Sequence, residues 1–174
     1  MQPARQDGDP DAFIAKLVGN GANDMCSMGT LTRQSILKNL RLRFQSELVY
    51  TYVGDIVLSV NPFKNVGCVG KAIRARYMAS HSQSALPPHI YALVHMAYNQ
   101  MRSESMSQSI LISGESGAGK TEAMKVCLAY LGELSSGPGA QDQNDGDVAK
   151  ELAQTNPVME AMGNAKVGGA LLPA

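Results

Sequence analysis

One stretch of the sequence, GESGAGKT, has the residue types and spacing of a phosphate-binding loop. It fits the pattern GxxxxGK[ST] and comprises Gly114, Glu115, Ser116, Gly117, Ala118, Gly119, Lys120 and Thr121. Glycines let the backbone curl so that successive N–H groups point at phosphate oxygens. Lys120 supplies a positive charge for the β- and γ-phosphates, and the Thr121 hydroxyl is a hard oxygen ligand suited to Mg²⁺. The pattern therefore predicts a nucleotide site with Mg²⁺.

The segments on either side of this loop are the ones that would position it. Residues 109–113, SILIS, form a short apolar run that predicts a strand, and AMKVCLAYLGEL predicts a helix through Leu134. The order strand, loop, helix suits phosphate binding, because the helix directs the positive end of its dipole at the ligand. We therefore expect an α/β fold, a P-loop NTPase-type sheet with flanking helices.

Two helices and a strand pair are predicted over residues 31–79. Thr32 is a plausible N-cap, with Leu31 positioned to pack on Ile36, and apolar residues continue at helical spacing to Phe44. A shorter helix is predicted over 71–79. Between the two helices lie two β-rich runs around a glycine turn, 48–52 and 55–60.

A third helix is predicted to open at Pro87-Pro88, since proline is tolerated in a first turn. Its predicted apolar face comprises Ile90, Leu93, Val94, Ala97 and Met101. After the phosphate-binding motif, 135–147 is predicted to be a polar surface loop, followed by short helices at 148–154 and from Pro157.

The composition excludes several classes of protein. Lysine plus arginine total 15 and aspartate plus glutamate total 15, so the net charge does not favour a general nucleic-acid binder. The three cysteines are scattered, which fits a reducing cytosol better than a disulfide framework. No apolar run approaches the ~20 residues that span a bilayer, so we expect no membrane insertion. His81, His89 and His95 lack metal-ligand spacing and are expected to be structural.

Only part of a nucleotide enzyme's usual set of motifs is present. A GTPase would carry an NKxD base-reading segment, and the sequence has none. An ATPase or phosphate kinase usually has an apolar strand ending in aspartate, and no run of four apolar residues here is followed by aspartate. The sequence therefore assigns no catalytic residue.

The residues around the loop resemble one family closely. GESGAGKTE, preceded by QSILISG, resembles the phosphate-binding loop of the myosin motor head, and the Glu, Ser and Ala inside it make the likeness specific. Other stretches resemble the same family in the same order: LVYTYVGDIVLSVNPF at 48–63, PPHIYALVHMAY at 87–98 and TNPVMEAMGNAK at 155–166. The resemblance runs from about Asp24 to Lys166. Ala123, where conventional heads often have Asn, favours an unconventional class.

The resemblance implies a function and a set of binding residues. The eight loop residues would hold the triphosphate of ATP and Mg²⁺, with Thr121 on the metal, and Asn61 and Pro62 would lie against the adenine. The family often has tyrosine eight positions after that asparagine, where this chain has Val69. The implied function is the ATP-binding part of an actin-based motor that couples ATP hydrolysis to movement along actin filaments. Its implied place is the cytoplasm, at the cytoskeleton.

The sequence departs from the family after Lys166, where it reads VGGALLPA. The NxxSSR stretch of switch I and the DxxGFE stretch of switch II do not occur in it. The resemblance thus implies the N-terminal part of a head, truncated before switch I: a flexible leader at 1–23, a partial motor domain at 24–166 and an unstructured tail at 167–174. Two alternatives stay open, a free-standing nucleotide-binding module and a non-functional truncated fragment.

Overall fold

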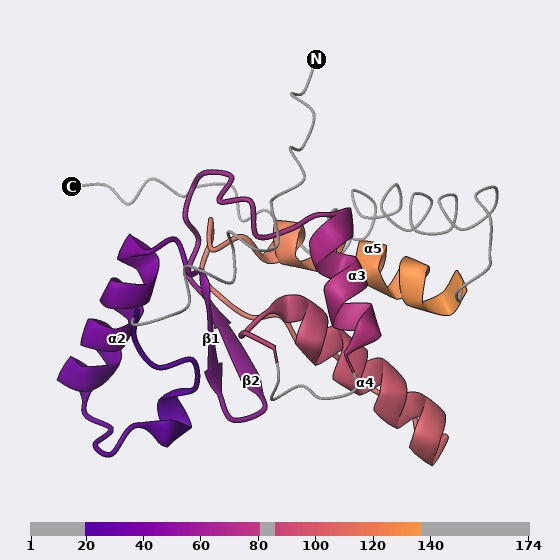
Figure 1. Ribbon diagram of the computed structural model, residues 1–174, viewed down its shortest axis with the longest axis horizontal. Helices are drawn as coiled ribbons and strands as arrows, with labels where there is room; N and C mark the ends of the chain where they lie inside the picture. Colours follow the sequence, from indigo (N-terminus) through magenta and orange to yellow (C-terminus); the bar gives the residue numbers. More distant parts are fainter. Residues whose placement is uncertain (1–19, 81–85, 137–174) are drawn as a thin grey trace, which may run out of the picture.

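The computed structural model describes residues 20–80 and 86–136, and Figure 1 shows the arrangement of its elements. In chain order they are η1 (Met25–Ser27), α2 (Arg33–Gln45), β1 (Tyr50–Val53), β2 (Ile56–Ser59), α3 (Lys71–Ala79), α4 (Ile90–Glu104) and α5 (Lys120–Ser136). The two strands lie between α2 on one side and α3, α4 and α5 on the other. Most of the loop predicted at 135–147 and the helices predicted after it lie outside the described residues.

The strand pair predicted around Gly54 is confirmed. β1 and β2 form an antiparallel hairpin whose register runs from Val53 opposite Ile56 to Tyr50 opposite Ser59. Gly54 has φ +59°, a conformation that glycine adopts without steric cost in a tight turn. β1 is largely buried, whereas the Ile56 side of β2 faces solvent. Within the described ranges the sheet has these two strands, so the larger predicted sheet is not seen there.

The chain before α2 is tied to the hairpin by backbone hydrogen bonds. The Tyr52 N–H donates to the carbonyl of Asn23 at 2.8 Å, beside a parallel bridge between Asp24 and Tyr52. The Asp24 carboxylate accepts from the backbone N–H groups of Cys26 at 2.9 Å and Gly54 at 3.1 Å. These two donors lower the pKa of Asp24 below its usual value. Residues 23 and 24 therefore cover the second edge of β1.

Helix α2 begins as predicted, and its fully buried residues are polar. Thr32 is its N-cap and forms a capping box with Ser35, which satisfies two of the N–H groups at the helix start. Leu37 on this helix is 58% exposed, and the fully buried residues are Asn39 and Arg43. Hydrogen bonds from Asn39 to the Ala22 carbonyl and from Arg43 to the Tyr50 carbonyl tie this helix to the chain before it and to the hairpin.

Arg43 is the residue that joins α2 to β1. Its guanidinium donates to the Tyr50 carbonyl at 2.8 Å, the Thr51 hydroxyl at 2.9 Å and the Asn23 side-chain oxygen at 2.8 Å. The side chain is 1% exposed, and burial lowers its pKa. A buried charge of this kind is tolerated only where its donors are satisfied, as they are here.

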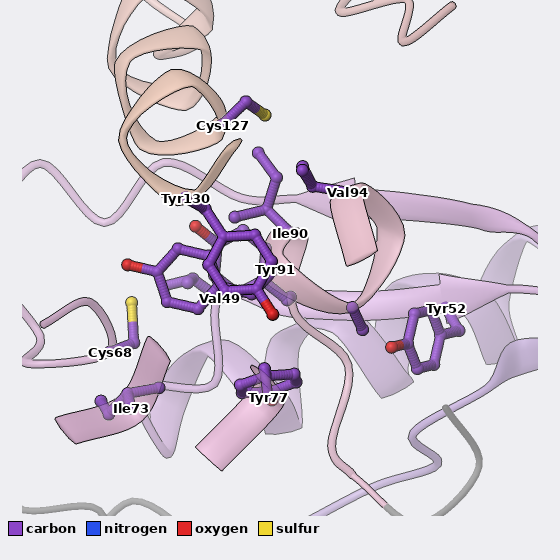
Figure 2. Close-up of a cluster of buried hydrophobic side chains, with 12 residues drawn as sticks. Val49, Tyr52, Cys68, Ile73, Tyr77, Ile90, Tyr91, Val94, Cys127 and Tyr130 are labelled. Atoms are coloured by element: carbon purple, nitrogen blue, oxygen red, sulfur yellow. The ribbon is translucent and has the colours of Figure 1, made fainter. Parts of the chain in front are cut away.

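An aromatic core lies on the other side of the hairpin, among α3, α4 and α5 (Figure 2). The rings of Tyr91 from α4 and Tyr130 from α5 stack with centroids 4.7 Å apart. His89 lies 4.2 Å from Tyr91 and 4.6 Å from Tyr50, ring centroid to ring centroid. Large rings packed at these distances contribute both buried area and edge or stacking contacts. This core fixes α5, and hence the start of α5, relative to the hairpin.

His89 has the structural role that the sequence predicts for it. Its Nδ1 accepts from the Tyr91 N–H at 3.0 Å, which makes His89 the N-cap of α4, and its Nε2 lies 2.7 Å from the Cys68 carbonyl. The two prolines therefore precede the cap, and the prediction that they open the first turn is wrong. With Nδ1 accepting, Nε2 must carry the proton that it donates to Cys68.

We expect His89 to make folding pH-dependent. Burial lowers its pKa from 6.5 to about 3, so the folded state binds fewer protons than the unfolded state between these values. The contribution of His89 to the free energy of unfolding should therefore have its full value above pH 6.5. It should fall as the pH drops toward 3, by up to about 1.4 kcal/mol per pH unit. Urea unfolding at pH 7, 6 and 5 measures this, with His89→Asn, which keeps a capping acceptor, as the control. Equal pH slopes for the two proteins would contradict the assignment.

The segment 109–113, predicted as a strand, is not part of a strand in the structure. Ile110 and Ile112 pack partly against the core, whereas Leu111 between them is 91% exposed. This alternation is that of a strand, but the described part of the chain places no second strand beside it. A strand needs backbone partners, and none is available there to complete the predicted ladder.

No helix within residues 20–80 and 86–136 is long and apolar enough to cross a membrane.

Leu111 is expected to promote self-association without stabilising the fold. Leu111→Ser should reduce concentration-dependent association and change the free energy of unfolding by less than about 0.5 kcal/mol, because the side chain is exposed. Sedimentation velocity over a concentration series and urea unfolding measure the two effects. Ile112→Ser is the control and should destabilise the chain, since Ile112 packs on the core. A large loss of stability in Leu111→Ser would show that its side chain is packed.

Candidate functional site

The predicted phosphate-binding loop leads directly into the longest described helix. α5 starts at Lys120, and its first intrahelical bond runs from the Ala123 N–H to the Gly119 carbonyl at 2.9 Å. Gly117 has φ +77° and Gly119 has φ +95°, conformations that other residues rarely adopt. The N–H groups of the first turn have no acceptor within the helix, so this end is electropositive. The arrangement predicted from the motif, a glycine loop at a helix N-terminus, is present, although the segment before it is not a strand.

Lys120 folds back over the loop. Its ammonium donates to the carbonyl of Gly114 at 2.7 Å and to the carbonyl of Glu115 at 2.8 Å. The residue is exposed, so these two contacts are open to exchange with other acceptors from solvent. An ammonium held at the mouth of a loop with an electropositive helix end can accept an anion such as a phosphate.

The structure brings the predicted Asn61 into contact with this loop. The Asn61 side-chain amide donates to the Gly117 carbonyl at 2.8 Å, across 56 positions of sequence. Its oxygen accepts from the Phe63 N–H at 2.9 Å. The end of β2 and the apex of the loop are thus joined through one side chain. The sequence predicts Asn61 beside the base, but it does not predict this contact with the loop backbone.

Pro62 faces a different space. It lines an open hollow of about 510 Å³ between the end of α2 and the loop that follows β2. The other lining residues are Phe44, Gln45, Ser46, Glu47, Lys64 and Val66. An ion pair of 2.7 Å between Glu47 and Lys64 lies at this hollow. Of the two residues predicted beside adenine, Asn61 hydrogen-bonds to the phosphate-binding motif and Pro62 lines this hollow.

The remaining predicted residues occupy the exposed surface of the loop and the first turn of α5. Glu115, Ser116 and Ala118 are exposed or partly exposed, and Thr121 is the second residue of α5. Within the described ranges, no group of three or more His, Cys, Asp or Glu side chains comes together in a way that could hold a metal ion. A Mg²⁺ at this site would therefore depend on the Thr121 hydroxyl and on oxygens of the nucleotide.

A smaller, mainly apolar cavity of about 180 Å³ lies between the loop, the hairpin and α4. Its walls include Val57 of β2, Leu93 of α4 and Ile112, and the loop contributes Gly119 and Lys120. Gly119 and Lys120 in its walls place this cavity directly beside the phosphate-binding motif.

Comparison with known proteins assigns the chain to a family. The family model described as myosin head (motor domain) matches residues 22–168. The chain belongs to the myosin head family. The segment that carries the phosphate-binding motif and the segment that carries Asn61 both fall inside the matched range, so the geometry above is that of a myosin head sequence. The predicted resemblance is confirmed.

Individual relatives agree with this assignment. The human protein named unconventional myosin-Ia is 42% identical over 146 residues, which cover 84% of this chain and 14% of the relative. The Dictyostelium discoideum protein named myosin IE heavy chain is 40% identical over 154 residues, covering 88% of this chain and 15% of the relative. The chain thus spans about one seventh of the length of the relatives that it matches.

Proposed function

We propose that this chain is the ATP-binding part of an actin-based motor, a myosin, that couples ATP hydrolysis to movement along actin filaments. The observation that carries the proposal is the loop GESGAGKT at the start of α5, with Lys120 folded over it, in a myosin head sequence. A free-standing nucleotide-binding module is less favoured, because the family match covers most of the chain. We place the motor in the cytoplasm, at the cytoskeleton.

Different residues of the proposed site would bind different parts of the nucleotide. The eight residues from Gly114 to Thr121 would hold the triphosphate, and the Lys120 ammonium would exchange the Gly114 and Glu115 carbonyls for phosphate oxygens. Thr121 would hold Mg²⁺, which when bound neutralises charge on the β- and γ-phosphates. The resemblance implies that Asn61 and Pro62 lie toward the adenine. In this arrangement the chain binds and orients ATP and supplies no catalytic residue of its own.

The segment 109–113 is proposed to be a strand of a P-loop NTPase-type sheet. Its alternating exposure and its position before the loop support this. Within the described residues, no strand pairs with the edge of β2 that faces away from β1. We propose that β2 is a second strand of the same sheet. The partial motor domain at 24–166 remains a prediction.

We expect the 174-residue chain by itself to bind ATP without motor activity. Phosphoryl transfer to water needs groups that position the water and stabilise charge, each worth ~10²-fold or more, and the sequence lacks the switch motifs that would supply them. The test combines titration with a fluorescent ATP analogue, phosphate release with and without actin, and actin co-sedimentation. Saturable binding without actin-stimulated release is the expected result. A folded chain that does not bind the analogue would refute the proposed function, and actin-stimulated turnover would refute the assignment of no catalytic residues.

A further inference from the structure

One peptide group at the apex of the phosphate-binding loop is held at both of its ends. The Gly117 carbonyl accepts from the Asn61 side-chain amide at 2.8 Å. The N–H of the same peptide group, that of Ala118, donates to the Glu115 carbonyl at 3.2 Å. In a trans peptide the C=O and N–H point in opposite directions, so two contacts of this kind fix the plane of the group.

We propose that Asn61 is a positioning residue for the phosphate-binding loop, acting through the Gly117 carbonyl. It holds the apex in its binding shape before a nucleotide arrives, and it does so from outside the loop. The inference rests on the proposed function, because it assumes that this loop binds a triphosphate. It assigns Asn61 a role at the phosphates, distinct from the contact with adenine that the sequence implies.

The asparagine is itself fixed, which a positioning residue must be. Its oxygen accepts from the Phe63 N–H at 2.9 Å, so both functional groups of the side-chain amide are engaged. It follows β2 closely, and β2 is paired along its length with the buried strand β1. The position of the Asn61 amide is therefore set by the hairpin.

The loop has need of such an anchor. Gly117 and Gly119 both adopt positive φ, and glycine loses more conformational freedom on ordering than any other residue. A Cβ built on Gly119 would lie 3.7 Å from the Asn61 amide nitrogen, so the asparagine is in reach of both glycines. Holding the loop in advance removes part of the entropic cost of binding, which raises affinity.

The proposal predicts which ligands lose affinity when the anchor is removed. If Asn61 acts on the loop, then ATP and inorganic tripolyphosphate, which has no base, should lose affinity by the same factor. If Asn61 instead contacts the adenine, only ATP should lose affinity. Tripolyphosphate with Mg²⁺ is therefore the discriminating probe.

The test compares Asn61→Ser with Asn65→Ser in the 174-residue chain. A serine hydroxyl at position 61 can still accept from the Phe63 N–H, but it is too short to reach the Gly117 carbonyl. Asn65 is the matched control, because its oxygen accepts from the Gly67 N–H at 2.9 Å in the same type of turn four residues later. Both substitutions are neutral in charge, so neither changes the attraction of the loop for phosphate through charge.

We expect Asn61→Ser to bind ATP and tripolyphosphate about tenfold more weakly than Asn65→Ser, measured by calorimetry or competition with a fluorescent analogue. Hydrogen exchange at the Ala118 N–H in the nucleotide-free chain should also be about tenfold faster in Asn61→Ser. The exchange measurement does not depend on the loop binding any ligand.

The outcomes separate the two hypotheses. Loss of ATP affinity with unchanged tripolyphosphate affinity would overturn the proposal in favour of adenine contact. Equal exchange rates and equal affinities in the two variants would overturn it outright. A wild-type chain that binds neither ligand would refute the proposed function instead, and the exchange rates would still decide whether Asn61 holds the loop.

Discussion

Lys120→Ala is expected to weaken the binding of Mg·ATP by about 100-fold. The ammonium is the positive side-chain charge that the structure places over the loop, and charge-assisted hydrogen bonds to phosphate are the strongest that the site can make. Titration with a fluorescent ATP analogue measures the effect. The free energy of unfolding should change little, because Lys120 is exposed and the carbonyls it leaves can turn to water.

Lys125→Ala is the matched control for this experiment. Lys125 lies on the same helix and is exposed, and its ammonium pairs with Glu122 at 2.7 Å, away from the loop. Lys125→Ala removes the same charge from the chain as Lys120→Ala, so any loss of affinity that comes from net charge alone appears in both variants. Equal affinities for Lys120→Ala and Lys125→Ala would show that the loop does not use its lysine to bind phosphate.

Arg43→Ala should destabilise the chain strongly, by about 3–5 kcal/mol. The substitution leaves the Tyr50 carbonyl, the Thr51 hydroxyl and the Asn23 side chain without their buried donor, and it leaves a cavity where the guanidinium was. Urea unfolding followed by circular dichroism measures the loss. ATP binding should be affected only through the fraction of unfolded chain, since α2, the helix that carries Arg43, lies on the opposite side of the hairpin from α5.

Two further variants serve as controls for the effect of Arg43→Ala on stability. Arg41→Ala removes an exposed arginine from the same helix and should change the free energy of unfolding by less than about 0.5 kcal/mol. Arg43→Lys keeps the charge but loses the planar fork that reaches several acceptors, so it should be nearly as destabilising as Arg43→Ala. A fully stable Arg43→Lys would mean that charge, rather than the hydrogen-bond geometry, holds α2 to the hairpin.

Local sequence signals predicted the elements whose causes are themselves local. The capping pair at the start of α2, the glycine turn between β1 and β2 and the helix after the phosphate-binding motif all depend on residues a few positions apart. Their bounds in the structure lie within a few residues of the predicted ones. The motif itself predicted a glycine loop at a helix start, and the structure has that arrangement.

The features that sequence patterns missed depend on contacts between distant residues. Arg43 appears in the sequence as one of several charges on an amphipathic helix, and only the partners supplied by β1 and residue 23 explain its burial. The contact of Asn61 with Gly117 joins positions 56 apart, and nothing local marks it beyond an asparagine before a proline. The segment 109–113 failed as a strand for the same reason, because pairing depends on a neighbour that local pattern cannot supply.

The central claim, that nucleotide binds at the loop before α5, is tested most directly by mapping the amide chemical shifts of the ¹⁵N-labelled chain during titration with Mg·ATP. We predict that the largest changes fall on the amides of 114–121 and of Asn61, with small changes along α2. Saturable changes confined to the hollow around Phe44 and Glu47, or no changes in a chain that is folded, would contradict the claim.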